Sequence, residues 1–288
     1  MRILVTNDDG IDAPGLHAVV AALASVEGVD VSVVAPDRNR SGVSRSITLG
    51  HTLVVTEEHV HGASVAFATD GTPTDCVRMA VLGLAGDPPD LVVSGANEGL
   101  NVGDDVTYSG TVSAAMEAAL NGLPAIAVSQ QSLHRELGFP RVREFNFDAM
   151  QNFLAGLVGH VMAEPNTLPA GTILNVNVPG LPLHGISGVE VGTLGRRIYR
   201  DRLELQHEQG GKRRYSLYGD DPSHHEEEGT DIAAVGRGCI AVTPLRFNLV
   251  NTEFGTAMAS WPFASFLGRD EGGARIVFRN QPPGAHRE

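Results

Sequence analysis

The chain begins Met1-Arg-Ile-Leu-Val-Thr-Asn-Asp-Asp-Gly10, and this stretch decides the fold. Residues 3–5 form a short apolar run without alternation, which is typical of a strand buried on both faces of a parallel sheet. The run ends in an Asn-Asp-Asp-Gly turn, where glycine permits a backbone conformation that other residues resist. A helix is expected next, at residues 16–24. Strand, acidic turn and helix together predict the first unit of an open α/β sheet, whose ligands bind beyond the carboxyl ends of its strands.

The adjacent carboxylates of Asp8 and Asp9 repel each other unless a cation lies between them or one of them is protonated. Only a turn lets both side chains aim at one point, because successive residues of a strand point to opposite faces. A hard divalent cation held by oxygen atoms suits this geometry. An isolated Asp-Asp-Gly is more often a solvated turn, so a metal site needs support from the rest of the chain.

The composition indicates a globular protein with an acidic surface. With 288 residues, 42% of them hydrophobic and 19% charged, the chain can bury a full core as one large domain with an appendage. Acidic residues outnumber basic ones by 34 to 21, and the formal net charge of −13 argues against a partner that is a nucleic-acid polymer or a membrane surface. An anionic substrate would therefore need a locally positive site.

The two cysteines, Cys76 and Cys239, make neither a disulfide framework nor a metal-binding spacing. We expect both to be small buried side chains in the reducing environment of the cytoplasm. Neither a secretory signal peptide nor an apolar run of about 20 residues that could span a membrane is expected.

Strand and helix patterns alternate through the first 184 residues and predict a doubly wound, mostly parallel, Rossmann-like sheet. The expected strands are residues 3–5, 29–35, 89–97, 124–129 and 171–178, with a hairpin or edge pair at 53–56 and 64–69 and a late strand at 239–244. The expected helices are residues 16–24, 71–84, 112–120 and 147–162, the second of them capped by Thr72 with Pro73 in its first turn.

Two loops attract attention because they follow predicted strands. Residues 38–46 contain three arginines and three serines, which favours either an anion-facing lid or an ordinary solvated loop. Residues 95–111 are rich in glycine but match neither a Walker motif nor the dinucleotide fingerprint. The segment from Ser109 to Thr111 lies where a helix should start, and free backbone N–H groups there would favour an anion. Capping of that helix by Ser109 or Thr111 is the simpler interpretation, and the two are compatible.

The character of the chain changes at about residue 185. We expect a core of residues 1–184 and 231–250, a protruding β-hairpin arm at 185–230, and a tail segment, 251–288, with a helix at 257–267. The arm has too few apolar residues for its own core, so it is predicted to form a homo-oligomer, a floppy insertion on a monomer being the alternative. The proposed interface contains Leu203, Leu205, Tyr215, Leu217 and Tyr218, with Arg196, Arg197, Arg200 and Arg202 pairing with Glu226-Glu-Glu228 across a two-fold axis.

An ordered set of motifs resembles the survival protein E (SurE) family of nucleotidases. They are Asn7-Asp-Asp-Gly10, Ala35-Pro-Asp37 with Ser41-Gly-Val-Ser44, Gly71-Thr-Pro-Thr-Asp75, Ser94-Gly-Ala-Asn97, Gly103-Asp-Asp105, Tyr108-Ser-Gly-Thr111, and Gly229-Thr-Asp231 with Thr243-Pro-Leu245. Each motif is weak by itself, whereas the set is specific and spans residues 1–245. Glu98 departs from the pattern, because the family often has a basic or imidazole residue there.

The resemblance implies a set of site residues. One divalent metal ion per subunit, Mg²⁺ or Mn²⁺, would be held by Asp8, Asp9, Ser41 and Asn97, all oxygen donors. The substrate phosphate would contact Asn101, Ser109, Gly110 and Thr111, which agrees at residues 109–111 with the helix-terminus argument. The family also implies a dimer or tetramer with extended arms and a tail segment exchanged between subunits.

The implied function is metal-dependent hydrolysis of nucleoside 5′- and 3′-monophosphates, with short polyphosphate and sugar phosphates as further substrates to test. Asp8 or Asp9 would orient the attacking water and accept its proton. An aspartyl-phosphate intermediate is the rival mechanism, because Asp8 follows a strand as it does in covalent phosphatases. A non-catalytic, metal-gated nucleotide sensor is the alternative from another functional class.

Overall fold

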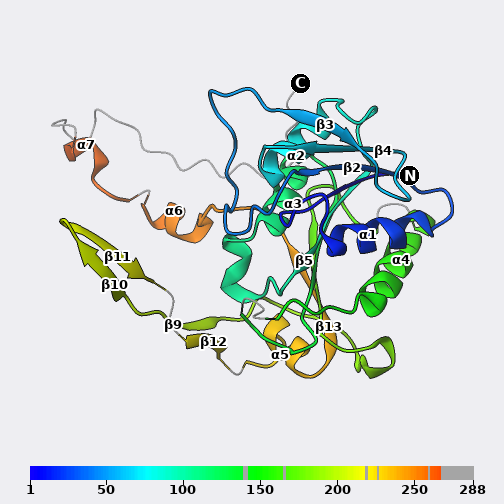
Figure 1. Cartoon of the computed structure of the whole chain (residues 1–288). Helices are drawn as coiled ribbons and strands as arrows, with labels where there is room; N and C mark the ends of the chain where they lie inside the picture. The colour runs from blue at the N-terminus through cyan, green and yellow to red at the C-terminus, as the bar shows by residue number, and fades with distance from the viewer. Residues whose placement is uncertain (139–141, 165–166, 218–219, 226, 259, 267–288) are drawn as a thin grey trace. The chain divides into compact units, whose positions relative to one another are not determined.

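The computed structural model describes residues 1–266 apart from 139–141, 165–166, 218–219, 226 and 259. The chain divides into two units, Met1–Arg246 and Phe247–Glu288. The first unit is built on a nine-stranded sheet with helices on both faces (Figure 1). This architecture confirms the predicted doubly wound, mostly parallel α/β fold.

The sheet has the strand order β3-β4-β2-β1-β5-β6-β7-β13-β8. Its members are β1 (Arg2–Thr6), β2 (Asp30–Pro36), β3 (Val55–Glu58), β4 (Val65–Thr69), β5 (Leu91–Glu98), β6 (Ala125–Gln130), β7 (Ile173–Val178), β8 (Gly188–Val191) and β13 (Cys239–Leu245). The six strands from β4 to β7 run parallel, while β3 and β13 join them antiparallel. Since β1 is flanked by β2 and β5, the direction in which the chain winds reverses there, and such a switch point opens a crevice.

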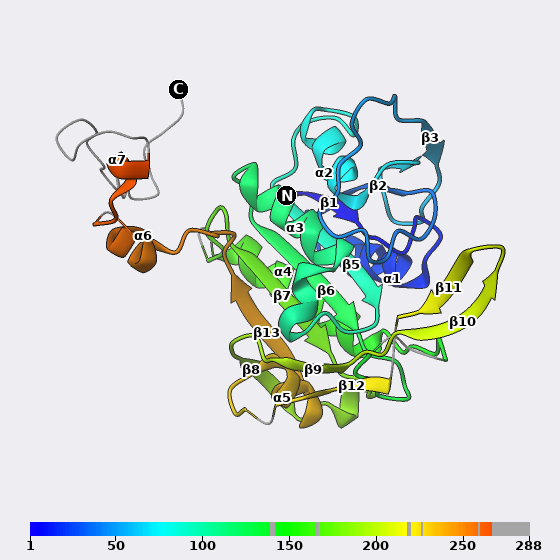
Figure 2. The same ribbon diagram turned by 90° about the vertical axis from the view of Figure 1, so that its left-hand side faces the viewer.

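Alternate residues of β1 face two different cores. Ile3 and Val5 pack with α1 (Pro14–Ala24) and α4 (Asp148–Ala163), whereas Leu4 packs on the opposite face with α2 (Pro73–Val81) and α3 (Gly110–Leu120). All three residues are fully buried, as expected for a central strand without alternation. The same layers are visible in Figure 2, where helices cover both sides of the central strands.

The two cysteines are free and buried, as their isolated positions predicted. Thr72 caps α2 in a capping box with Asp75, and Pro73 occupies the first turn, so that predicted helix start is confirmed. Among the helices that the structure describes, none combines the length and apolar character needed to cross a membrane.

The predicted boundary at residue 185 is wrong, because β8 belongs to the central sheet. It pairs parallel with β13, with Val189 opposite Ile240 and Val191 opposite Val242. Both valines of β8 are more than half exposed, so this edge strand leaves little burial pattern in the sequence. The arm therefore starts after β8, with β9 (Arg197–Arg200).

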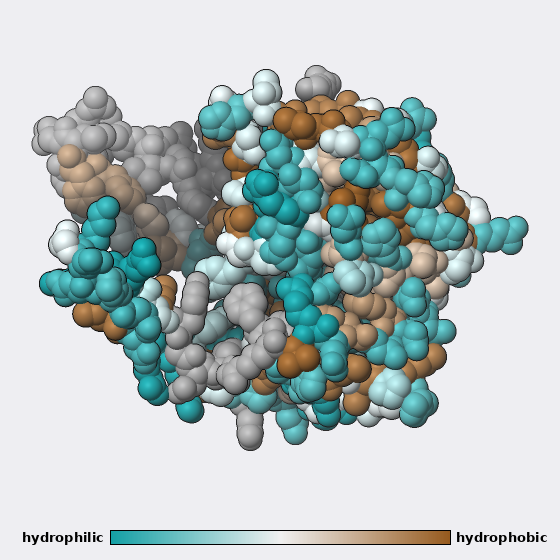
Figure 3. Space-filling model, in the orientation of Figure 1, coloured by the Kyte–Doolittle hydropathy of each residue, from teal (hydrophilic) through white to brown (hydrophobic). Residues whose placement is uncertain are grey.

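The arm consists of two small antiparallel ladders. The first pairs β9 with β12 (Asp220–His224), and the second is the hairpin of β10 (Glu204–Gln209) and β11 (Lys212–Ser216), which projects from the body of the first unit (Figure 1). Mostly hydrophilic side chains cover the hairpin, with a smaller hydrophobic patch (Figure 3). The exposed apolar residues include Leu203, Leu205, Tyr215 and Leu217, while Tyr218 lies outside the described residues.

Two of the arginines predicted to pair across a two-fold axis have partners in their own chain. Arg196 contacts Glu227 at 3.4 Å. Arg197 is buried and forms an ion pair with Asp105, so its assignment to a subunit interface is wrong. The physical reason is that β9 runs beside the loop before α3, where Asp104 and Asp105 bind the arginine. Glu226 lies outside the described residues.

The second unit contains two short helices, α6 (Thr252–Met258) and α7 (Phe263–Phe266). The predicted single tail helix at 257–267 is therefore wrong in its extent, because Pro262 cannot continue a helix. Rings of Phe254, Trp261, Phe263 and Phe266 contact one another in sequence, with centroid separations of 5.6–6.0 Å. The predicted helix end at Leu267 lies outside the described residues.

Candidate active site

The candidate site lies at the carboxyl ends of β1 and β5. Asp8 and Asp9 follow β1, and Asn97 and Glu98 are the last residues of β5. The two strands are parallel neighbours, with Thr6 opposite Ser94. The predicted acidic turn and the predicted amide ligand therefore meet at the switch point of the sheet, where α/β proteins bind their ligands.

Asn7 closes the acidic turn. Its Nδ2 donates to the Gly10 carbonyl at 2.8 Å, and its Oδ1 accepts from the Gly10 N–H at 3.2 Å. Gly10 has a φ of 105°, which residues with a Cβ rarely adopt. This local bonding holds Asp8 and Asp9 in a loop rather than on an extended strand, and both carboxylates are almost entirely buried.

The carboxylate of Asp8 abuts the first turn of α3. Its Oδ1 accepts a hydrogen bond of 2.5 Å from the Thr111 hydroxyl. Burial, together with the neighbouring charge of Asp9, raises the pKa of Asp8 to about 6. A Cβ placed on Gly110 would lie 2.7 Å from the Asp8 Oδ2, so only glycine allows the helix and the carboxylate to approach this closely.

Helix α3 begins at Gly110, two residues before the predicted start. Ser109 is its N-cap, and its side chain accepts from the Val112 N–H at 3.1 Å. Ser109, Gly110 and Thr111 are all buried at this end. The predicted capping role is confirmed, and the same terminus keeps the partial positive charge that favours a phosphate.

Asp9 is held by three donors from three separate parts of the chain. Its Oδ1 accepts from Asn39 Nδ2 at 2.8 Å and from Arg143 Nη2 at 3.3 Å, and its Oδ2 accepts from the Glu98 N–H at 3.0 Å. Ser41 is exposed and is connected to this group indirectly, because its N–H donates to Asn39 Oδ1. Sequence reasoning missed both Asn39 and Arg143.

The two predicted asparagines have different environments. Asn97 Nδ2 donates to the Gly99 carbonyl at 2.8 Å, so its Oδ1 is the atom suited to a cation. Asn101 is buried deeper, where its Nδ2 donates to Ser129 and its backbone bonds with Asn175 and Asn177. One of the two Nδ2 hydrogens remains for a phosphate, but no hydrogen bond joins Asn101 to the acidic turn.

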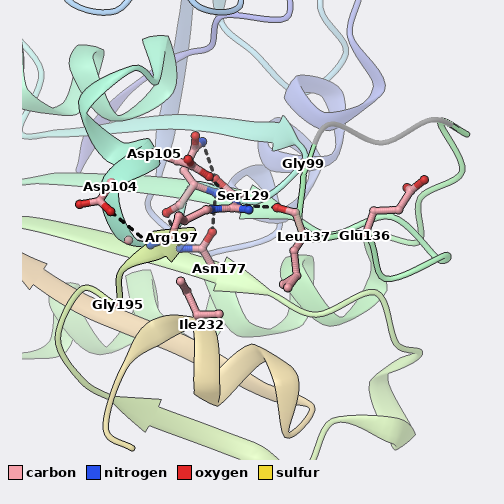
Figure 4. Close-up of polar contacts among 12 residues, drawn as sticks. Gly99, Asp104, Asp105, Ser129, Glu136, Leu137, Asn177, Gly195, Arg197 and Ile232 are labelled. Atoms are coloured by element: carbon pink, nitrogen blue, oxygen red, sulfur yellow. Dashed lines mark hydrogen bonds and ion pairs between the residues drawn. The ribbon is translucent and has the colours of Figure 1, made fainter. Parts of the chain in front are cut away.

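The loop that leads into α3 is braced from the arm. The Arg197 guanidinium pairs with Asp105 and donates to the Leu137 carbonyl, and its backbone N–H donates to Asp104 (Figure 4). The Tyr199 hydroxyl also bonds Asp105. Burial raises the pKa of Asp105, an effect that the adjacent guanidinium opposes. The base of the arm thus fixes the short helix η1 (Gly103–Thr107), which precedes Ser109.

The three arginines of the 38–46 loop contact groups of their own chain. Arg40 donates to the Asp70 carbonyl at 2.5 Å, and Arg45 contacts the buried Glu117 carboxylate at 3.0 Å. Arg38 lies 3.7 Å from Asp37. Each of these cations contacts an acidic or carbonyl group of its own chain, which favours the ordinary loop over the anion-facing lid.

The donor set available to a metal consists of oxygen atoms. Within the part of the chain that the structure describes, no cluster of three or more His, Cys, Asp and Glu side chains is arranged to hold a metal ion. The predicted set differs from such a cluster, because it has two carboxylates, one amide and one hydroxyl. An ion that prefers oxygen fits this set better than one that prefers imidazole or thiolate.

Fold and site together define an α/β protein with paired carboxylates beside a helix terminus at the switch point of a parallel sheet. The family model described as "Survival protein SurE" matches residues 3–201. A protein of Rubrobacter xylanophilus named 5′-nucleotidase SurE is 46% identical over 270 residues, which are 93% of this chain and 100% of the relative. A protein of the same name from Geobacter metallireducens is 44% identical over 92% of this chain and 98% of the relative.

A crystal structure titled as the SurE protein from Aquifex aeolicus is also similar. It has a TM-score of 0.73 and 38% sequence identity, covering 90% of this chain and 98% of the other. The chain therefore belongs to the survival protein SurE family, as its ordered motifs indicated.

Proposed function

We propose that this protein is a metal-dependent phosphomonoesterase that hydrolyses nucleoside 5′-monophosphates to nucleoside and phosphate. The observation that carries the proposal is the direct contact of Asp8 with the first turn of α3, because it supports a cation ligand and a phosphate-binding helix terminus acting side by side. A phosphate bound at that terminus would face the paired carboxylates. The nucleotidase names of the relatives support the reaction class.

A single Mg²⁺ or Mn²⁺ fits the residues present. Asp8 is a buried carboxylate whose pKa of about 6 reflects a charge without sufficient compensation, which is what a cation would supply. Asp9, Asn97 and Ser41 would complete the oxygen ligands. When bound, the cation would neutralise phosphate charge and lower the pKa of a coordinated water.

The chain's own groups account for binding and proton transfer. The N–H groups at Ser109, Gly110 and Thr111 would hold the phosphoryl oxygens, with Asn101 as a further donor. Asp8 or Asp9 would orient the attacking water and accept its proton. Phosphoryl transfer from the substrate to an added alcohol would instead favour an aspartyl-phosphate intermediate on one of them.

Metal binding is expected to weaken as the pH falls through about 6. Asp8 is protonated below its folded-state pKa, so a cation must displace a proton there, and each metal bound should release up to one proton. The pKa of Asp8 in the folded protein lies above that of an unperturbed aspartate, so the metal-free fold should also gain stability between pH 6 and 4 relative to pH 7. Calorimetric Mn²⁺ titrations in two buffers of different ionisation enthalpy measure affinity and proton release.

Thr111→Val is the matched variant for this prediction. It keeps the size of the side chain but removes the hydrogen bond that lowers the pKa of Asp8. The pH at which Mn²⁺ affinity is lost should therefore move upward in the variant. An affinity that is constant from pH 7.5 to 5, in both proteins, would show that Asp8 does not bind the metal.

A phosphate-release assay tests the proposed reaction directly. Nucleoside 5′-monophosphates with Mn²⁺ should give turnover, and a panel of 3′-monophosphates, sugar phosphates and tripolyphosphate defines the range of substrates. Tight nucleotide binding without phosphate release from any of these compounds would instead support the metal-gated sensor. Covalent and direct mechanisms are then separated by the alcohol-transfer test.

We further propose that the arm mediates a dimer or tetramer. Leu205 and Tyr215 are opposite each other on the hairpin, and both are about half exposed, so they offer an apolar anchor to a second copy. Replacing both by serine should shift the particle toward a monomer of about 30 kDa in light scattering, with the fold retained because neither residue belongs to the core. A wild-type chain that is already monomeric at micromolar concentration would rule out this role.

A further inference from the structure

Glu98 and Arg143 form an ion pair at the edge of the acidic turn. Arg143 Nε and Nη2 both donate to Glu98 Oε2, at 2.9 and 2.6 Å, and the same Nη2 also reaches Asp9 Oδ1 at 3.3 Å. Glu98 comes from β5, whereas Arg143 lies in the loop between β6 and α4. One guanidinium therefore bridges a residue of the proposed metal site and a carboxylate with no role in that site so far.

The burial of the two carboxylates distinguishes this bridge from an ordinary surface salt bridge. The side chains of Asp9 and Glu98 are 4% and 6% exposed, and Asp8 is buried next to them. Three carboxylates so close together, with so little water around them, repel one another strongly. Exposed ion pairs contribute little to stability. A cation shared by two buried carboxylates matters more, because its loss leaves two buried charges without compensation.

The two contacts of Arg143 differ in strength. Glu98 receives two short hydrogen bonds, while Asp9 receives one longer one. Asp9 Oδ1 already accepts from Asn39, so a metal ion that binds this oxygen must compete with a donor. Of the two donors to Asp9 Oδ1, Arg143 makes the longer contact, so it is the one that a metal ion would displace. The Arg143 side chain is 54% exposed, so its guanidinium has room to rotate while it stays hydrogen-bonded to Glu98.

We infer that Arg143 is a second cation of the active site, anchored by Glu98, and that it exchanges Asp9 for the substrate phosphate. In the metal-free protein the guanidinium neutralises Asp9. Once a metal ion binds Asp9, the guanidinium is repelled from that oxygen but stays beside the site, where it binds a phosphoryl oxygen of a phosphomonoester. Guanidinium groups suit this task because their planar fork matches phosphate oxygens. The inference rests on the proposed function, which supplies the phosphate.

Two effects of opposite sign follow from removing the charge. In Arg143→Gln, Mn²⁺ should bind the metal-free protein roughly three- to tenfold more tightly, because a competing cation is gone. Inorganic phosphate and nucleoside 5′-monophosphate should bind the Mn²⁺-loaded variant roughly tenfold or more weakly, because a charge-assisted hydrogen bond is lost. Titration calorimetry measures both affinities without turnover.

Three further variants make the test specific. Arg135→Gln is the control, since Arg135 lies in the same loop but donates to the Val235 and Gly236 carbonyls. It should change neither affinity. Arg143→Lys keeps the charge and should restore part of the phosphate affinity. Glu98→Gln removes the anchor, so phosphate affinity should fall, and adding Arg143→Gln should then have a smaller effect than it has alone.

A merely structural role for Arg143 would weaken both ligands together or leave both unchanged, and either result would overturn the inference. Its failure is distinct from failure of the proposed function. If the wild-type protein releases phosphate from nucleotides while Arg143→Gln binds phosphate normally, only the role of Arg143 is lost. If the wild-type protein does not bind Mn²⁺ or phosphate, the proposed function fails first.

Discussion

Replacing Asp9 by asparagine is expected to lower kcat/KM for nucleoside monophosphate hydrolysis by about 10³-fold or more, because it removes a charged ligand from the proposed metal site. The fold should persist, since Asp9 contributes hydrogen bonds at the end of β1 rather than apolar packing. Steady-state phosphate release and thermal unfolding of the same preparation measure the two effects. The loss should not be rescued by excess Mn²⁺ if the ligand charge itself is required.

Asp12→Asn provides the matched control. Asp12 lies three residues further along the same turn, but it is exposed and is not a predicted ligand. Both substitutions remove one negative charge from the same region, so a general change in the field would affect both alike. Near-wild-type turnover is expected for Asp12→Asn. Comparable activities of the two variants would show that Asp9 is not a ligand.

Gly110→Ala is expected to lower kcat/KM by about 10²-fold with little effect on folding. The added Cβ would lie 2.7 Å from both the Cβ and the Oδ2 of Asp8, so either the carboxylate or the first turn of α3 must shift. A displacement of this kind disturbs the proposed metal ligand and the phosphate donors together, and small misplacements of reacting groups are costly. Kinetics and thermal unfolding of the variant separate activity from stability.

Gly156→Ala is the control for the same chemical change. Gly156 is exposed within α4, and an added Cβ would meet no atom within 4 Å. Alanine is the better helix former, so this variant should be more stable by about 0.5–1 kcal/mol and fully active. Full activity of Gly110→Ala would mean that the contact between Asp8 and α3 is not part of the site.

The parts of the site that are local in sequence could be predicted. The Asn7–Gly10 turn carries its own geometry, because Asn7 bonds Gly10 and Gly10 supplies the positive φ. Ser109 is likewise recognisable as a cap from the residues beside it. Alternation of apolar strands and helices predicted that each feature follows a strand of one parallel sheet, whereas the contact between Asp8 and Thr111 is seen only in the structure.

The remaining features depend on contacts between distant residues. Arg143 reaches Asp9 across 134 residues, and Arg197 reaches Asp105 across 92, without any local pattern that marks either partner. Asn39 lies in the 38–46 loop, where the arginines and serines, and not this asparagine, favoured a functional interpretation. Edge strand β8 was assigned to the arm rather than to the central sheet, because its valines are exposed and the usual burial signal is absent. The sequence pattern therefore did not reveal the long-range charge pairs or the place of β8 in the sheet.

Titration of chelator-stripped protein with Mn²⁺, while phosphate release from a nucleoside 5′-monophosphate is followed, tests the central claim most directly. The rate should be at background without metal and should rise to a plateau as one ion binds each subunit, with Asp9→Asn remaining at background throughout. Full turnover by the stripped protein, or the same rise with Asp9→Asn, would contradict a catalytic metal held by the acidic turn.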